Sequence, residues 1–294
     1  MYLDIQTFKA KPGEPAYSKP HMCMRVVAPM QLKFASFHQS KNGMIEPVCQ
    51  QLHKWKQKNI GVDTIRCDNA GENKGLRART ESAAWKLGID YEFTARDTPQ
   101  QNHLAEIAIS NINNRGRALL YRAHVPKRHK RKLFREAWLT AVKLDGLEVV
   151  TLNHITKTRY EHLFGTNPSF ANHLRTWGEA GTVKLKTSTT PKMHTKGTAC
   201  MFVGYTNDHT GDCYRMWNPI TNMVHETRDV LWLNRMYFKC PTYHPEMMTD
   251  PLAAVEAGER ANALNNTNNP NNNNQQEAED EDEEKEPFDR NLRH

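Results

Sequence analysis

The sequence has few cysteines for its length, and no two of them lie close together. Its 294 residues include six cysteines, without the Cys-x-x-Cys spacing of a zinc half-site or the dense framework of small disulfide-linked domains. There is no apolar run of about 20 residues, the length of a membrane-spanning helix, and no basic-then-apolar signal peptide. We therefore expect free thiols, a reducing intracellular setting and no membrane partner.

Acidic residues are scarce over most of the chain. Nine of the 33 lie between Glu277 and Asp289, so residues 1–276 hold 37 Lys and Arg against 24 Asp and Glu, a net charge of +13. Such an excess attracts polyanions, of which nucleic acid is the usual one. A solvated surface that favours solubility explains the charge equally well. Charge alone leaves both explanations open.

The first 125 residues predict an α/β domain. Hydrophobic alternation predicts strands at 2–9, 24–27, 31–38, 64–67 and 90–93, and helical periodicity predicts helices at 44–58, 76–87 and 104–124. The order is three strands, a helix, a strand, a helix, a strand and a long helix. That order matches a ribonuclease-H-like fold, a mixed five-stranded sheet with flanking helices.

The remaining residues divide into three further segments. Residues 126–173 are expected to be a helical connector that opens on a basic cluster, and residues 174–238 a small β-barrel of short strands separated by turns. Residues 239–294 are rich in Asn and then in acidic residues, and they cannot bury enough apolar area to offset ordering entropy. We expect this last segment to be a disordered tail, following a core at 1–125.

Three acidic residues stand where the predicted strand order brings chain segments together. Asp4 lies in the first strand, Asp68 directly follows the fourth, and Glu106 lies near the start of the long helix. Three carboxylates can hold two divalent cations and leave coordination positions open for phosphate oxygens, with Mg²⁺ as the expected metal. Alternatively, Asp68 caps a turn and Glu106 is an ordinary solvated residue of a first helical turn.

The residues around two of these carboxylates carry a resemblance to a known family. Residues 65–73 (IRCDNAGEN) resemble the DNGGEF segment of Copia-type retrotransposon integrases, and residues 98–106 (TPQQNHLAE) resemble their TPQQNGxxER segment. The family's first aspartate lies in an opening strand that residues 3–7 (LDIQT) resemble. Further similar segments lie at 115–119, 134–138, 162–168, 174–178 and 200–205, so the resemblance covers residues 2–236 and includes the SH3-like barrel of these polyproteins.

The resemblance implies a function and its site. Asp4, Asp68 and Glu106 would form the D,D-35-E triad, here with 37 residues between the last two, and would act as catalytic and metal-binding residues with Mg²⁺ or Mn²⁺. The implied reaction is processing and strand transfer of DNA, with element ends and host target DNA as partners. The family also implies a homo-multimer, association with other parts of the polyprotein, and a location in the nucleus or a cytoplasmic virus-like particle.

A set of polar and basic residues is predicted to contact nucleic acid. Each also has an ordinary structural explanation, as a turn residue or as part of a solvated basic face. The set flanks the predicted carboxylates and continues along the long helix into the basic cluster: Asn69, Gly71, Gln101, Asn102, Arg115, Arg117, Arg122, Lys127, Arg128, Lys130, Arg131 and Lys132.

The chain also departs from the family pattern. His103 replaces the usual Gly, Ile107 replaces a frequent Arg or Lys, and Val27 stands close to a position where related sequences carry Asp. The family's zinc-binding His/Cys module would precede the first aspartate, so we expect an N-terminally truncated core. A catalytically inactive nucleic-acid-binding remnant is therefore an alternative. A nonspecific ribonuclease-H-like nuclease is a third, but that hypothesis does not predict the barrel.

Overall fold

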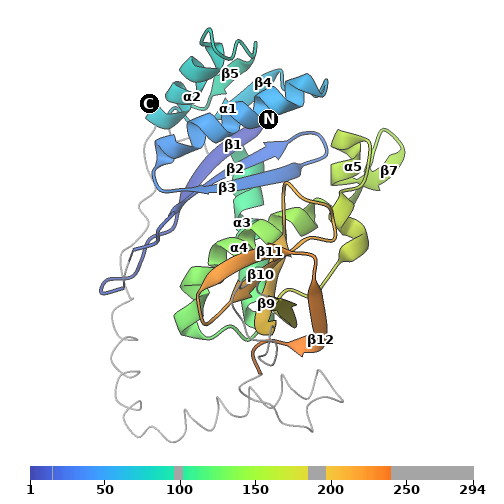
Figure 1. The fold of residues 1–294 in the computed structure, drawn as a ribbon. Coiled ribbons are helices and arrows are strands. Elements are labelled where there is room, and N and C mark those ends of the chain that lie inside the picture. The colour runs from blue at the N-terminus through green and yellow to red at the C-terminus, as the bar shows by residue number, and fades with distance from the viewer. Residues whose placement is uncertain (15, 96–101, 185–196, 240–294) are drawn as a thin grey trace, which may run out of the picture. The chain divides into compact units, whose positions relative to one another are not determined.

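The computed structural model describes residues 1–14, 16–95, 102–184 and 197–239 (Figure 1). The first sheet contains the strands β1 (Tyr2–Thr7), β2 (His21–Val27), β3 (Leu32–His38), β4 (Thr64–Cys67) and β5 (Asp90–Phe93) in the order β3-β2-β1-β4-β5. β2 is antiparallel to β1 and β3, whereas β4 is parallel to β1 and β5. This mixed five-stranded sheet gives the predicted ribonuclease-H-like fold.

Helices cover both faces of this sheet because the strands are apolar on both. Leu3 and Cys23 point to the face covered by η1 (Lys41–Met44), α1 (Ile45–Gln57) and α2 (Gly71–Glu81). Met22 and Met24 point to the opposite face, covered by α3 (His103–Arg122) and α4 (Lys127–Asp145). Alternate residues of one strand therefore enter two separate cores.

The predicted helix at 76–87 was misplaced, because α2 runs from Gly71 to Glu81. The Ser82 hydroxyl donates to the Arg79 carbonyl at 2.6 Å, and the backbone leaves the helix at this residue. Trp85 and Leu87 continue the apolar periodicity beyond that point, which misled the prediction. Leu87 instead folds back, and its N–H donates to the Thr80 carbonyl at 3.1 Å.

The second sheet confirms the predicted small β domain. Its strands are β8 (Glu179–Lys184), β9 (Gly197–Tyr205), β10 (Tyr214–Asn218), β11 (Met223–Thr227) and β12 (Val230–Met236), in the order β11-β10-β9-β8-β12 with antiparallel neighbours. The expected helical connector at residues 126–173 contains, besides α4, the helix α5 (Arg159–Phe164) and the short η3 (Ser169–His173). It also contains a hairpin of β6 (Val149–Leu152) and β7 (Ile155–Thr158), which the sequence did not predict.

Helix α4 contacts both sheets, through β3 on one side and β9 on the other. The segment Met1–Lys239 accordingly forms one compact unit. The finer division at residues 125 and 173 stays a prediction, and the expected disordered tail, apart from Lys239, lies outside the described residues. Within the described ranges, five cysteines are buried and free, and no helix there has the length and apolar character needed to cross a membrane.

Candidate active site

The pairing of β1 with β4 brings two of the predicted carboxylates together. The strands run parallel, and Tyr2 lies opposite Arg66. Because both chains advance in the same direction, the position two residues further on β1, Asp4, lies level with Asp68 directly after β4. Asp4 is partly buried within the sheet, whereas Asp68 is exposed at the strand end.

The third carboxylate reaches the same region through the start of α3. Tyr2 packs in the core on the α3 side of the sheet and Leu3 in the core on the opposite side, so the alternation places Asp4 on the face that α3 covers. The buried side chain of Asn102, just before α3, donates from Nδ2 to the Leu3 carbonyl at 3.1 Å. This hydrogen bond ties the beginning of α3 to β1, and Glu106 follows one turn later as an exposed residue.

The charges of Asp68 and Glu106 act on the carboxyl group of Asp4. Burial raises the pKa of Asp4 above its ordinary value, and the charges of Asp68 and Glu106 raise it further. The Ile5 N–H, which donates to Asp4 Oδ1 at 2.7 Å, and the positive charge of Lys41 act in the opposite direction. The site therefore concentrates negative charge, an arrangement that a bound cation would relieve.

Neighbouring polar groups support this arrangement. Asn73 Nδ2 donates to both the carbonyl and the side-chain Oδ1 of Asp68, with 3.2 Å to the carbonyl. Asn73 Oδ1 and Asn102 Oδ1 are buried and have no hydrogen-bond partner among the described residues. Lys41 forms an ion pair with Glu72 at 3.0 Å. Asn73, Lys41 and Glu72 were not among the site residues predicted from the sequence, although Asn73 and Glu72 lie inside the motif that contains Asp68.

The donor set has the chemistry of a hard-cation site, because it consists of carboxylate and amide oxygens. The two buried amide oxygens without donors fit the same chemistry. However, no group of three His, Cys, Asp or Glu side chains across the described ranges is placed to hold one metal ion. The residue types thus fit a divalent cation, while the three carboxylates do not form a closed ligand shell in this structure.

Two of the predicted DNA contacts lie beside the carboxylates, and one does not face outward. Asn69 and Gly71 are exposed, directly after Asp68 and at the first position of α2. Asn102 is buried, with its amide bound to β1. Gln101 lies outside the described residues. The structure thus gives Asn102 a tethering role and leaves Asn69 and Gly71 accessible.

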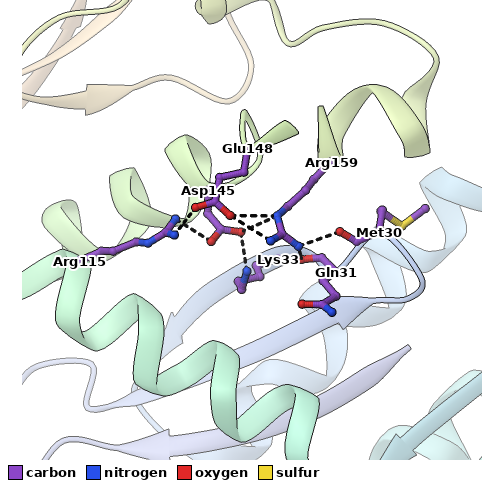
Figure 2. A network of polar contacts seen from close by, with 7 residues as sticks. All are labelled: Met30, Gln31, Lys33, Arg115, Asp145, Glu148 and Arg159. Carbon is purple, nitrogen blue, oxygen red and sulfur yellow. Dashed lines mark hydrogen bonds and ion pairs between the residues drawn. The ribbon is translucent and has the colours of Figure 1, made fainter. Parts of the chain in front are cut away.

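The arginines of α3 fall into two groups. Arg117 and Arg122 are exposed, whereas Arg115 donates to Asp145 Oδ1 at 2.8 Å and also to Glu148. Figure 2 shows the guanidinium of Arg115 directed toward these two carboxylates. Arg115 is therefore part of an internal ion network.

The basic cluster at the start of α4 likewise contains one residue with internal partners and four exposed residues. The side chain of Arg131 donates to Glu14, and its guanidinium lies 4.6 Å from the ring centroid of Tyr17. The other four basic residues predicted to bind nucleic acid are exposed: Lys127, Arg128, Lys130 and Lys132. These four give the first turns of α4 a solvated, positively charged face.

Sequence comparison identifies a matching domain family and a related polyprotein. Residues 181–244 match the retroviral polymerase SH3-like domain family. The chain is also 27% identical over 187 residues to the retrovirus-related Pol polyprotein from transposon TNT 1-94 of Nicotiana tabacum. The resemblance to Copia-type retrotransposon polyproteins is thereby confirmed. The match covers 63% of this chain and 13% of the Nicotiana polyprotein.

The solved structures that the chain matches include retroviral proteins, at low TM-scores. The HTLV-2 integrase catalytic core domain in complex with magnesium (trimeric form) is 14% identical, with a TM-score of 0.37, and covers 55% of this chain and 93% of its own. A simian T-cell lymphotropic virus intasome in complex with the PP2A regulatory subunit B56 gamma is 15% identical, with a TM-score of 0.39, and covers 82% and 78%. The assignment of the ribonuclease-H-like fold depends on the strand order described above.

Proposed function

We propose that this chain is the integrase segment of a retrotransposon polyprotein and that it carries out metal-dependent processing and strand transfer of DNA. One observation carries the proposal: the parallel neighbours β1 and β4 bring Asp4 level with Asp68, and the charge of Glu106 also acts on Asp4. The match to a transposon Pol polyprotein supports the same function.

In this proposal Asp4, Asp68 and Glu106 hold Mg²⁺ or Mn²⁺. The bound cations would activate the attacking hydroxyl and stabilise the leaving oxygen of the phosphodiester. Asn73 orients the Asp68 carboxylate through its two hydrogen bonds, and Asn102 positions the helix that carries Glu106. Because the cations neutralise the carboxylates, they also remove the repulsion that raises the pKa of Asp4.

The proposed DNA contacts are the exposed residues of the predicted set together with Gln101. Phosphates of the element ends and of the target duplex would bind these residues, which position the DNA without reading its sequence. Asn102, Arg115 and Arg131 have intramolecular partners, and we assign them supporting roles. The contact set is Asn69, Gly71, Gln101, Arg117, Arg122, Lys127, Arg128, Lys130 and Lys132. A homo-multimer that holds two DNA ends completes the proposal.

The test is strand transfer of a labelled duplex carrying the element's terminal sequence, in Mg²⁺ or Mn²⁺. We expect Asp68→Asn and Glu106→Gln each to reduce transfer by at least about 100-fold, the usual effect of removing one electrostatic contributor at a reacting centre. DNA affinity, measured as a function of salt, should remain within about twofold because the basic surface is unchanged. The matched control is Glu81→Gln, which removes a half-exposed carboxylate paired with Arg77.

Two outcomes would overturn the enzymatic proposal. Equal transfer by the unaltered chain and Asp68→Asn would show that another group catalyses the reaction. No transfer by the unaltered chain, with salt-sensitive DNA binding retained, would favour the alternative of a catalytically inactive nucleic-acid-binding remnant. The observation that favours this alternative is that, in the described part of the chain, the three carboxylates are not placed to hold one metal ion together.

A further inference from the structure

A cavity of about 700 Å³ lies among β2, β3, α1, α4 and the segment that joins β9 to β10. None of Asp4, Asp68 and Glu106 lines it, so it is separate from the proposed active site. Its volume falls within the range of about 300–1,000 Å³ that is usual for sites of small organic ligands. What distinguishes this cavity is the charge on its wall.

Arg25 on β2 contributes a buried guanidinium to that wall, with 4% of its surface exposed. Its Nη1 donates to Gln51 Oε1 at 2.6 Å and its Nη2 to Ser36 Oγ at 3.1 Å, and both acceptors are neutral. Its Nε has no partner among the described residues. Burial lowers the pKa of Arg25, and no carboxylate acts to raise it. Among the residues that the structure describes, Arg25 is therefore a buried cation without a carboxylate partner.

The charge of Arg25 also acts on the neighbouring side chain of His38. Burial lowers the pKa of His38 to about 4, and the charge of Arg25 contributes to this lowering. His38 accepts or donates a 2.7 Å hydrogen bond with Ser36, which also binds Arg25. A buried charge is costly unless it is paired, and no carboxylate in the described ranges pairs with this one. The arrangement is that of a site prepared for an external anion.

The other basic residues of the wall differ from Arg25 because they already have partners. Lys33 is paired with Asp145 at 2.6 Å, and Arg215 is paired with Glu136 at 3.0 Å. Lys143 donates to the carbonyls of Tyr205 and Thr206 at 2.6 and 2.9 Å. Within the described ranges, Arg25 is therefore the basic residue of this wall that has neither a carboxylate nor a backbone carbonyl as its partner.

Aromatic side chains supply a second kind of surface in the same cavity. Tyr160, Phe170 and Tyr205 line it, and the rings of Phe170 and Tyr205 stack with centroids 4.7 Å apart. Aromatic side chains can stack on any planar heterocycle, because every such ring has a π-face. A buried guanidinium and aromatic rings in one cavity together match a ligand with a phosphate and a flat ring.

We propose that this cavity binds a phosphorylated small molecule of nucleotide size, with a phosphate at the Arg25 guanidinium and the ring against the aromatic wall. The ligand's phosphate supplies the counter-anion that none of the described residues provides, through the guanidinium hydrogens not used by Gln51 and Ser36. The guanidinium is suited to phosphate because its planar N–H fork matches adjacent phosphate oxygens.

The test uses the full 294-residue chain in EDTA, so that cations at the carboxylate site do not contribute. ATP, pyrophosphate, inorganic phosphate, adenosine and succinate are titrated by calorimetry at constant ionic strength. We expect ATP to bind most tightly, pyrophosphate to bind less tightly, and adenosine and succinate not to bind measurably at 1 mM. Gln51→Glu should weaken ATP binding by at least about tenfold, because it places an isosteric carboxylate 2.6 Å from Arg25 Nη1.

Matched variants separate this site from the exposed basic surface. Gln57→Glu also replaces a glutamine of α1 by glutamate, but at an exposed position, and it should leave the affinity for ATP unchanged. Arg122→Gln, which removes an exposed arginine of α3, should also leave this affinity unchanged. Arg25→Met, checked by circular dichroism, should also lose binding. The proposal would be overturned if Gln51→Glu and the unaltered chain bound ATP equally well, or if Arg122→Gln lost ATP binding. It would also be overturned if succinate bound as tightly as pyrophosphate, or if ATP did not bind at all.

Discussion

At the scale of single residues, the partners of a side chain decide its role more than its type does. Arg115 and Arg122 lie two turns apart on α3, yet Arg115 is bound to two carboxylates and Arg122 is exposed. Asn69 and Asn102 were predicted to contact DNA alike, but Asn102 is buried against β1. A basic residue that is already paired with a carboxylate is thus less available to an anionic ligand than one without such a pair.

A prediction at this scale concerns Asp4. Because burial and the charges of Asp68 and Glu106 all disfavour its ionised form, Asp4→Asn should increase the free energy of unfolding of the metal-free protein at pH 7 by about 1 kcal/mol. The Asn side-chain oxygen can still accept from the Ile5 N–H. The same substitution should abolish the thermal stabilisation produced by Mg²⁺ or Mn²⁺. Denaturant titration with and without metal measures both effects.

The control for this prediction is Asp63→Asn, which removes an exposed carboxylate in the loop just before β4. It should change neither the metal-free stability nor the response to metal by more than about 0.5 kcal/mol. A metal-free Asp4→Asn protein that is less stable than the unaltered chain would show that the Asp4 carboxylate is stabilising, contrary to the argument from repulsion.

At the scale of elements, a buried ion network joins β3, α3, α4 and α5 (Figure 2). Asp145, which is 1% exposed, receives Lys33 Nζ at 2.6 Å and Arg115 Nη1 at 2.8 Å. Arg159 binds Glu148 at 3.0 Å and donates to the Met30 carbonyl at 2.9 Å. Burial lowers the pKa of Lys33, although Asp145 acts in the opposite direction. The network fixes the end of α4 against the edge of the first sheet.

We expect Asp145→Asn to reduce the free energy of unfolding by about 3–5 kcal/mol, because it leaves the Lys33 ammonium buried without its carboxylate. The double variant Lys33→Met with Asp145→Leu should recover most of this loss, since it removes both charges and keeps apolar volume. Chemical denaturation of the three proteins measures the difference.

The matched control is Glu148→Gln, which removes a carboxylate from the same network at a site that is 37% exposed. Its expected cost is about 1 kcal/mol or less because solvent screens the pair. A cost for Asp145→Asn no larger than that of Glu148→Gln would show that the burial of Asp145 does not determine its contribution.

At the scale of the whole molecule, α4 joins the two sheets of Met1–Lys239. Thr140 donates to the Val203 carbonyl at 2.9 Å, and Lys143 donates to the carbonyls that end β9. Glu136 receives two hydrogen bonds from Arg215 on β10, both at 3.0 Å. One face of α4 thus serves the second sheet while another enters the core of the first, so we expect both sheets to unfold together.

Lys143 gives this junction a dependence on pH. Burial, followed by the charge of Arg215, lowers the pKa of Lys143 to about 8, although Glu136, Glu226 and Asp208 act to raise it. Between pH 8 and the ordinary lysine value of 10.5, the unfolded chain binds more protons than the folded one. The contribution of Lys143 to the free energy of unfolding therefore rises with pH across this interval.

We expect the stability of the unaltered chain relative to Lys143→Met to increase between pH 8 and pH 10.5, by an amount on the order of 2 kcal/mol. Comparison with the variant removes the contributions of cysteines and tyrosines that titrate in the same interval. Lys132→Met, an exposed position on the same helix, should show no such change. Parallel pH profiles for the unaltered chain and Lys143→Met would contradict the prediction.

The sequence by itself determined the local elements and the type of fold. Alternating apolar residues and turn signals are local properties, so the five strands of the first sheet and its long helix followed from the printed order of residues. The motifs around Asp68 and Glu106 likewise carried the resemblance to Copia-type polyproteins, which the sequence comparisons support. Where a local signal misled, as at Ser82, a side-chain hydrogen bond ended the helix although the apolar periodicity continued.

Only the tertiary structure decided which polar groups meet. The register of β1 with β4 places Asp4 level with Asp68. Lys33 forms an ion pair with Asp145, which lies 112 positions away in the sequence. In the sequence, Arg25 is one basic residue of a predicted strand. Only the structure shows that its guanidinium is buried and donates to neutral acceptors. The physical reason is that pairing and burial depend on segments distant in sequence, and no local pattern records them.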